Sequence, residues 1–423
     1  MADVKPLRTL RYDIESVGSL EAVIAPPYDV IDAPMRAELL ARSPFNVVEV
    51  DLPEAPGGGD PYQHAEETFE EWRQQGVLVR ESEPALWALE QAYTAPDGSR
   101  RKRRGFFARV RVEDYGPGRI RPHERTHPGP KEDRLALTRA TRANLSPIFS
   151  LFADTDGAAA EVLARAVATE PFASAADADG TTNALWRIAD SEELSALQSA
   201  LAEAELLIAD GHHRYETARI YADEVGGEGE HSYVLMLLCS ISDPGLLVFP
   251  THRLLTGLKD DTPKQQAIRE ALMRDFEVEQ VTAKELEPTG GDGAAVQLGY
   301  MDSFHRQPYR LTLKRQEIAD AALADRSEPY RRLDTAVLEA IVLKGALGMS
   351  EDDISHLRGL GYSKSLDDAR EAVEAARADA GFFMRATPVE QVREVAEAGE
   401  SMPPKSTYFF PKVPTGLVFN VLE

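Results

Sequence analysis

The sequence predicts an α/β or α+β protein built around a mixed β-sheet. Short apolar runs with the length and branching of buried strands recur along the chain, and amphipathic helical segments alternate with them. Polar motifs follow several of the apolar runs directly, as expected for loops at strand ends. At 423 residues, the chain is also long enough for two or three domains with separate cores.

Residues 1–255 carry most of this alternation and form the predicted α/β catalytic region. The predicted strands span residues 46–50, 86–93, 105–112, 144–152, 184–188, 206–208, 232–242 and 246–250. The predicted helices span residues 33–42, 62–75 and 158–166, and another begins after Asp190, which forms a capping box with Glu193. Turn signals at residues 96–98 and 243–245 predict two hairpins. We expect the basic run RRKRR at residues 100–104 either to form the polar end of the first hairpin or to bind a phosphate.

The remaining residues form two further sections. Residues 256–385 are charged and mostly helical, with one hairpin near residues 296–313. We expect this section to be a second domain or a large insertion, which either covers the site or makes a homodimer contact. Residues 386–423 are predicted to be a C-terminal segment that returns to the site.

Composition excludes several classes of protein. Hydrophobic residues make up 43% of the chain and charged residues 28%, and no apolar run approaches the roughly 20 residues that span a bilayer. The first residues contain no apolar export signal, and the single cysteine, Cys239, excludes a disulfide framework. A formal net charge of −24 argues against a nucleic-acid partner. We therefore expect a cytoplasmic protein that binds neither membranes nor nucleic acid.

The run LLIADGHHRYE at residues 206–216 is the strongest candidate for a functional site. It predicts a buried strand, a tight turn and a helix, with two histidines and an arginine at the helix N-terminus. The backbone N–H groups and dipole at such an N-terminus favour anions. Gly211 lets the backbone approach a ligand, and Arg214 adds a planar donor pair suited to phosphate or carboxylate. The alternative is a helix that Asp210 caps, with its histidines in solvent.

A second group of candidates lies in the loop RIRPHERTHPGPKEDR at residues 119–134. Its H-E-x-x-H spelling matches a zinc protease motif, but the flanking prolines argue against the long helix which that chemistry requires. We expect instead a loop that presents His123, Glu124 and Thr126, followed by a helix with Lys131 and Arg134 in its first turns. In this arrangement Glu124 or Asp133 would hold a metal or accept a proton.

Three other segments offer polar groups at strand ends. The consecutive prolines of IAPPYDV at residues 24–30 would project Tyr28 and Asp29 from a stiff turn, although the turn alone is an alternative role. Arg253 follows the apolar run that ends at residue 250. Residues 399–406 approach a Walker A loop, but Pro404 replaces its second glycine, which argues against a true P-loop. Four residues of this tail could still reach phosphate: Lys405, Ser406, Thr407 and Lys412. The alternative is an ordinary surface turn.

These motifs resemble known families. The DGHHR run is similar to the signature of the ParB/sulfiredoxin-like superfamily, in particular its free serine kinase branch. Together with IAPPYDV, KEDRL at residues 131–135, PTHRLL at residues 250–255 and PPKSTYFFPK at residues 403–412, it makes the chain resemble the DUF1015 family over nearly its full length. The resemblance implies a ParB/sulfiredoxin-like core, to which the largely helical section would be added.

The resemblance also implies a set of roles. In the serine kinases, DGHHR handles nucleotide phosphates and a glutamate acts as base on the serine hydroxyl; Glu124 is assigned to that base from its context. Catalytic roles are therefore assigned to Glu124, Asp210, His212 and His213. Phosphate or nucleotide contacts are assigned to Gly211, Arg214, Lys131, Arg134, Lys405, Ser406 and Thr407. Substrate contacts are assigned to Tyr28, Asp29, His123, Thr126 and Arg253, and metal contacts to Glu124 and Asp133.

The leading hypothesis is an Mg²⁺-assisted phosphotransferase that uses ATP or ADP and a small hydroxylated amino acid or hydroxy acid. Phosphoryl transfer needs charge neutralisation, carboxylates for a metal, and a base, and the candidate residues include each type. Serine and O-phosphoserine are the substrate pair that the resemblance implies. Two alternatives remain: a nucleotide-binding regulator of ParB-like type without turnover, and a metal-dependent phosphatase.

Overall fold

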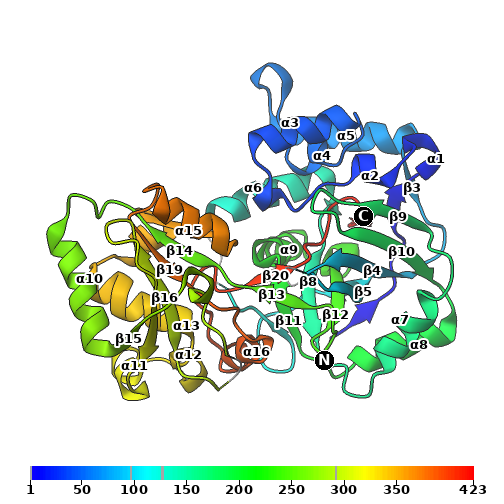
Figure 1. Cartoon of the computed structure of the whole chain (residues 1–423). Coiled ribbons are helices and arrows are strands. Elements are labelled where there is room, and N and C mark those ends of the chain that lie inside the picture. Colours follow the sequence, from blue (N-terminus) through cyan, green and yellow to red (C-terminus); the bar gives the residue numbers. More distant parts are fainter. Residues whose placement is uncertain (1, 96–97, 125–127, 291–292) are drawn as a thin grey trace. The chain divides into compact units, whose positions relative to one another are not determined.

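The computed structural model describes residues 2–95, 98–124, 128–290 and 293–423, and the chain divides into two compact units (Figure 1). Unit 1 comprises Met1–Pro122, Thr126–Leu246 and Pro411–Glu423. Unit 2 comprises His123–Arg125 and Leu247–Phe410. Unit 2 thus takes in more of the chain than residues 256–385, and the last residues of the chain belong to unit 1. No helix in the described part of the chain is both long enough and apolar enough to cross a membrane.

Unit 1 is built on a mixed sheet, which confirms the predicted fold class. Within the described residues the sheet has nine strands in the order β6-β11-β8-β12-β5-β4-β10-β9, with β1 paired to β5. The pairs β11–β6 and β12–β8 are parallel and the other pairs are antiparallel. The strands are β1 (Val4–Lys5), β4 (Leu86–Thr94), β5 (Arg100–Arg111), β6 (Ile120–Arg121), β8 (Ile148–Phe152), β9 (Ala173–Ala176), β10 (Thr182–Ile188), β11 (Leu206–Asp210) and β12 (Tyr233–Ser240). Two small pairs join β2 (Leu10–Tyr12) to β3 (Leu78–Arg80) and β7 (Ala143–Asn144) to β21 (Asn420–Val421).

Helices complete the core of unit 1. They are α1 (Ile14–Val17), α2 (Leu20–Val23), α3 (Ala33–Arg42), α4 (Val48–Asp51), α5 (Pro61–Gln74), α6 (Pro128–Thr141), α7 (Ala158–Ala166), α8 (Ser191–Leu201) and α9 (His212–Val225), with 3₁₀ turns η1 (Tyr28–Val30), η2 (Pro56–Gly58) and η3 (Glu230–Ser232). Leu163 of α7, Leu197 of α8 and Tyr215 of α9 pack against strand residues such as Phe106 and Met236. Burial of these apolar side chains holds α9 against the sheet, and the first turn of α9 follows the buried strand β11 directly in the chain.

Unit 2 has its own core and its own sheet. The sheet order is β15-β17-β16-β19-β14-β18, and all its pairs are antiparallel. The strands are β14 (His252–Leu255), β15 (Phe276–Gln280), β16 (Gln297–Asp302), β17 (Tyr309–Leu313), β18 (Leu360–Ser363) and β19 (Ala380–Phe383), and β13 (Leu247–Phe249) pairs separately with β20 (Tyr408–Phe410). The helices are α10 (Thr262–Asp275), α11 (Gln316–Ala322), α12 (Glu328–Arg331), α13 (Asp334–Leu338), α14 (Glu351–Ser355), α15 (Leu366–Glu374) and α16 (Val389–Glu397), with a 3₁₀ turn η4 (Ala283–Glu285) and a π-helix η5 (Glu339–Ala346).

The predicted hairpin near residues 296–313 is confirmed as β16 and β17. The rest of residues 256–385 was expected to be mostly helical, but the helices there pack on a six-stranded sheet. Leu272 of α10 and Val342 of η5, for example, share one buried cluster with Leu298 and Phe382 of the sheet. The strands of this sheet are only four to six residues long, which gave the sequence little alternation to show.

Three local predictions for residues 1–255 were wrong. The strand predicted at residues 46–50 is replaced by α4, which ends at Asp51. The turn at residues 243–245 does not join a hairpin, because β5 and β8 occupy both edges of β12 and β13 pairs with β20 instead. The strand predicted at residues 105–112 begins at residue 100 instead; the basic run at residues 100–104 does lie at the turn end of the β4–β5 hairpin, but within β5, so alternate side chains point to opposite faces of the sheet.

Candidate functional site

The DGHHR run adopts the predicted strand, turn and helix. Asp210 ends β11, Gly211 is the N-cap residue of α9, and His212, His213 and Arg214 form the first turn of that helix. Gly211 has a φ of 97°, a left-handed conformation that glycine adopts readily. A Cβ atom at this position would also lie 3.1 Å from the Arg214 guanidinium carbon. Glycine therefore permits both the turn and the close approach of Arg214.

Two cations hold the carboxylate of Asp210. The Lys412 ammonium donates to Oδ1 at 2.7 Å, and Arg214 Nη2 donates to Oδ2 at 2.6 Å. Arg214 Nη1 also donates to the Pro147 carbonyl oxygen. The side chains of Asp210, Lys412 and Arg214 are only 19%, 15% and 11% exposed, so the ion pairs are shielded from solvent. The N-cap residue of α9 is Gly211 rather than Asp210, whose two carboxylate oxygens accept from Lys412 and Arg214.

This arrangement places positive charge at the N-terminus of α9. Burial alone would raise the pKa of Asp210, but the Lys412 ammonium and the Arg214 guanidinium outweigh it and hold that pKa well below its usual range. The two cations share the Asp210 carboxylate, and the carboxylates of Asp29 and Asp51 also act electrostatically on Arg214. The dipole of the 14-residue helix α9 adds partial positive charge at the same end. The site is therefore suited to an anion, and phosphate matches the donor geometry of the arginine.

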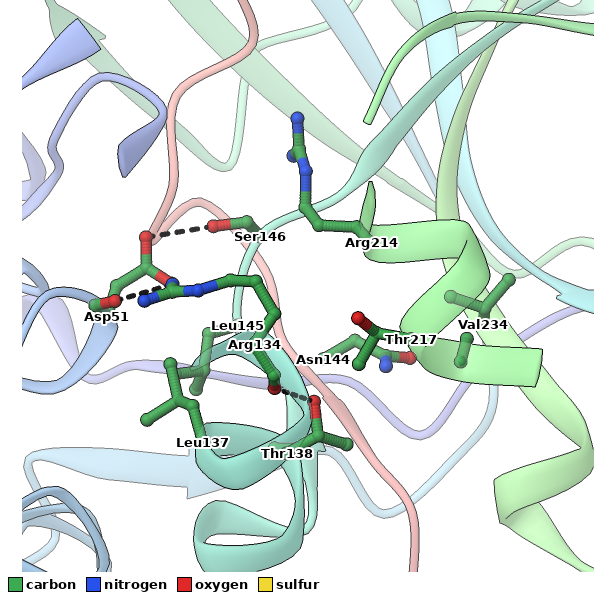
Figure 2. Close-up of a pocket in the computed structure, with 12 residues that line it drawn as sticks. Asp51, Arg134, Leu137, Thr138, Asn144, Leu145, Ser146, Arg214, Thr217 and Val234 are labelled. Atoms are coloured by element: carbon green, nitrogen blue, oxygen red, sulfur yellow. Dashed lines mark hydrogen bonds and ion pairs between the residues drawn. The ribbon is translucent and has the colours of Figure 1, made fainter. Parts of the chain in front are cut away.

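Arg134, the second predicted arginine, lies in a neighbouring buried network. Its Nη1 donates to the Asp51 backbone oxygen at 2.7 Å and lies 3.3 Å from Asp51 Oδ1, while the guanidinium stands 4.2 Å from the Tyr28 ring centroid. Ser146 donates to the other Asp51 oxygen at 3.1 Å, and Figure 2 shows the Arg134 guanidinium and Ser146 on either side of this carboxylate. Burial raises the pKa of Asp51 against the opposing charge of Arg134.

A small cavity separates this network from α9. It has a volume of about 40 Å³, and its lining includes Asp51, Arg134, Ser146, Arg214 and Thr217 (Figure 2). A volume of this size has room for only a few water molecules. A nucleotide would therefore have to contact the N-terminus of α9 outside the cavity.

The other predicted residues of unit 1 occupy the surroundings of these groups. Tyr28 and the exposed Asp29 lie in η1, and both are within electrostatic range of Arg214. Lys131 is half-buried in the first turn of α6. Asp133 pairs with Arg134 at 2.7 Å and accepts a hydrogen bond from Tyr62 at 2.9 Å. These contacts bring Tyr28, Asp29 and Arg134 into the neighbourhood of the DGHHR run.

Six predicted site residues belong to unit 2 instead. His123 is buried, and its Nε2 lies 2.9 Å from Thr407 Oγ1. Arg253 donates to the carbonyl oxygens of Thr251 at 2.5 Å and Pro404 at 3.2 Å, and burial lowers its pKa. Glu124 is half-buried and within electrostatic range of Arg253.

The tail residues of unit 2 differ in exposure. Ser406 is buried and donates to the Pro403 carbonyl oxygen at 2.6 Å, whereas Lys405 is exposed. Lys405, Ser406 and Thr407 belong to unit 2. The same unit contains His123, Glu124 and Arg253, whereas the DGHHR run belongs to unit 1. Thr126 and the rest of residues 125–127 lie outside the described residues.

The predicted metal ligands do not form a recognisable centre. No group of three or more histidine, cysteine or acidic side chains suited to a metal is found in the described parts of the chain. Asp133 is already paired with Arg134, and Glu124 belongs to unit 2. A magnesium ion, which often binds one or two carboxylates together with substrate phosphates, would depend mainly on its nucleotide for ligands.

Sequence reasoning undervalued three residues that the fold brings to this region. Lys412 was considered only as one of several tail residues, Asp51 was placed in no site, and Arg103 was one of five consecutive basic residues. Lys412 is 202 residues from Asp210 in the sequence, and Asp51 is 83 residues from Arg134. The only local signal was that Lys412 lies in a tail motif rich in phosphate-suited residues.

The fold and site together define an α/β protein in which the Asp210 carboxylate pairs with two cations, Lys412 and Arg214, at the N-terminus of α9. The chain belongs to the family described as "Protein of unknown function (DUF1015)", whose profile matches residues 4–336. The resemblance to this family is therefore confirmed. The comparison with curated proteins found no match.

Several solved structures are similar to parts of the chain. One is a free serine kinase in complex with AMP, at 14% identity and a TM-score of 0.35, covering 70% of this chain and 88% of the kinase. Another is a conserved hypothetical protein from Pyrococcus furiosus, at 15% identity and a TM-score of 0.34, covering 70% and 92%. A third is SbnI with a C-terminal truncation from Staphylococcus aureus, at 12% identity and a TM-score of 0.38, covering 75% and 87%.

Proposed function

We propose that this chain binds the phosphate groups of ATP or ADP at the N-terminus of α9 and transfers a phosphoryl group to or from a small hydroxylated amino acid or hydroxy acid. The observation that carries the proposal is the pairing of one carboxylate, Asp210, with two cations, Lys412 and Arg214. These two cations and the helix dipole attract phosphate. A phosphate that joins this cluster would accept from Lys412 and Arg214 beside the Asp210 carboxylate.

The residues of the cluster would have separate roles. Arg214 and Lys412 would neutralise charge on the transferred group, which is the main requirement of phosphoryl transfer. Asp210 would orient these two cations, because a carboxylate with so low a pKa is a weak base. His212 and His213, in the first turn of α9, would supply further donors.

The acceptor and its base come from the resemblance rather than from this geometry. Serine is the proposed acceptor, and the resemblance assigns its base to a glutamate; within unit 1, the Asp210 carboxylate is held ionised by two cations and is too weak a base for that role. Magnesium is the proposed counter-ion of the nucleotide. No step here depends on it, because the described residues provide no metal cage.

The activity is tested by incubating the full chain with serine, Mg²⁺ and either ATP or ADP, and following O-phosphoserine by ³¹P NMR. The reverse reaction, from O-phosphoserine and AMP or ADP, is run in parallel. We expect turnover in at least one direction, and loss of turnover in Arg214→Gln with the fold retained. Nucleotide that binds without turnover of serine or any of a panel of small hydroxy acids would contradict the phosphotransferase assignment.

A nucleotide-binding regulator without turnover is the second candidate. It is favoured by the absence of a suitable base in the Asp210 cluster, where the carboxylate is held ionised by two cations. The same experiment separates the two functions, because the regulator would bind ADP or ATP at Arg214 and Lys412 but leave both nucleotides unchanged.

A further inference from the structure

Arg103 is a buried cation that no part of the proposed mechanism uses. It is 1% exposed, and within the described ranges no carboxylate forms a salt bridge with it, although Asp243 and Asp210 act on it electrostatically. Its Nη2 donates to Gln91 Oε1, whereas its Nη1 is buried without a hydrogen-bond partner in the described structure. Burial of a charge that forms no direct salt bridge is destabilising, so stability alone does not account for an arginine here.

The position of Arg103 in the sheet directs it toward the anion site. Arg103 is on β5, and β12 lies between β5 and β8 in the sheet. The guanidinium nevertheless stands 4.3 Å from the ring centroid of Phe149 on β8, so the side chain crosses β12. Phe149 is the partner of Asp210 in the ladder between β8 and β11. Arg103 thus ends beside the strand that leads into α9, within electrostatic range of Asp210.

A hydrogen-bonded path also connects Arg103 to Lys412. Gln91 accepts from Arg103 through Oε1, and its Nε2 donates to the Lys412 carbonyl oxygen at 2.9 Å and to Asn183 Oδ1 at 2.7 Å. Gln91 and Asn183 are fully buried. The backbone of Lys412 is therefore fixed by the same side chain that Arg103 orients, while the Lys412 ammonium reaches Asp210.

We infer that Arg103 is a positioning residue of the anion site, which fixes Lys412 through Gln91 and adds buried positive charge beneath the Asp210 cluster. The inference rests on the proposed function for the identity of the anion, a nucleotide phosphate. It gives a role to a buried guanidinium that the proposed phosphoryl transfer does not otherwise use. The guanidinium acts through Gln91, Lys412 and its own charge, without itself touching the ligand.

The test compares Arg103→Met and Gln91→Glu with a matched control, Arg104→Met, in the full chain. Gln91→Glu gives Arg103 a counter-ion and removes the amide that donates to Lys412. Arg104 is the next residue on β5; it points to the other face of the sheet and pairs with Glu90 at 2.8 Å. Two quantities are measured: the rate at which acetic anhydride modifies the Lys412 amine, by mass spectrometry, and the affinity for ADP, by calorimetry.

We expect both site variants to raise the Lys412 modification rate several-fold and to weaken ADP binding roughly tenfold, as when one nearby charge is lost from a partly buried site. The melting temperature of Arg103→Met should stay near that of the wild type, because burial of an apolar side chain in place of a charge offsets the lost hydrogen bond to Gln91. Arg104→Met should leave both quantities unchanged. Wild-type modification rates in both site variants, or wild-type ADP affinity despite faster modification, would overturn the inference. If the wild-type chain binds no ADP, the proposed function fails, while the modification rates still decide whether Arg103 positions Lys412.

Discussion

Removal of the Asp210 carboxylate gives the most informative single perturbation of the site. Asp210→Asn removes the carboxylate that accepts from both Lys412 and Arg214. Breaking a buried ion pair by removing one partner costs about 3–5 kcal/mol. Because these side chains are still 11–19% exposed, we expect a loss at the lower end of this range, roughly 3 kcal/mol of unfolding free energy.

Tryptophan fluorescence is a suitable assay because Trp72, Trp87 and Trp186, the three tryptophans of the chain, all belong to unit 1. For a unit of this size, about 3 kcal/mol corresponds to a fall of roughly 6–12 °C in melting temperature. Asp223→Asn is the matched control, since Asp223 is exposed on the same helix, and we expect its melting temperature to stay near that of the wild type.

Pyrophosphate distinguishes an anion site from an ordinary structural ion pair. Asp210→Asn should bind pyrophosphate more tightly than the wild type, because the anion replaces the missing charge. At about 100 times its Kd, a ligand adds about 2.7 kcal/mol of stability, so pyrophosphate should restore most of the melting temperature that Asp210→Asn loses. A given rise in melting temperature should need less pyrophosphate in the variant than in the wild type. A variant as stable as the wild type, or one with a smaller response to pyrophosphate, would refute this reasoning.

Three further outcomes are expected. Gly211→Ala should weaken ADP binding measured by calorimetry, because φ is 97° and the new Cβ would lie 3.1 Å from the Arg214 guanidinium carbon; unchanged affinity would show that Arg214 is not held there. Burial lowers the pKa of His252 to about 4, so its imidazole should stay neutral by NMR down to about pH 5. An unfolded histidine titrates near pH 6.5, so the stability contributed by the neutral, buried His252 is fully present above that pH and is lost as the pH falls toward 4. Titration of His252 near pH 6.5 in the folded chain would contradict its burial. Cys239 is buried and burial raises the pKa of its thiol, so a thiol reagent should modify it only on unfolding, and rapid modification of the native chain would be inconsistent with the core.

The local features of the DGHHR run could be predicted because they depend on neighbours in the sequence. The apolar run, the glycine and the helical spacing fix a strand, a turn and a helix whatever packs around them, and α3 and α7 have the expected bounds for the same reason. The partners of the run could not be predicted in this way. Lys412 reaches Asp210 only because residues 411–423 return to unit 1, and this depends on pairing between segments far apart in the chain.

The errors have a similar origin. The basic run at residues 100–104 has the composition of an exposed turn, but continuation of β5 through it buries Arg103 and leaves Lys102 59% exposed. Apart from the β16–β17 hairpin, the sheet of unit 2 escaped prediction because its strands are short and most of them are separated by helices. The candidate residues His123, Glu124 and Arg253 have the right chemistry for the proposed site, but sequence gave no sign that they belong to a different compact unit from DGHHR.

The most direct test of the central claim compares ADP binding by Lys412→Met and Lys405→Met. Both lysines lie in the tail motif, but only Lys412 contacts Asp210, whereas Lys405 is exposed. We predict that Lys412→Met weakens ADP binding at least tenfold in calorimetry and that Lys405→Met binds as the wild type does. Loss of binding in Lys405→Met with wild-type affinity in Lys412→Met would contradict the assignment of the phosphate site to the N-terminus of α9.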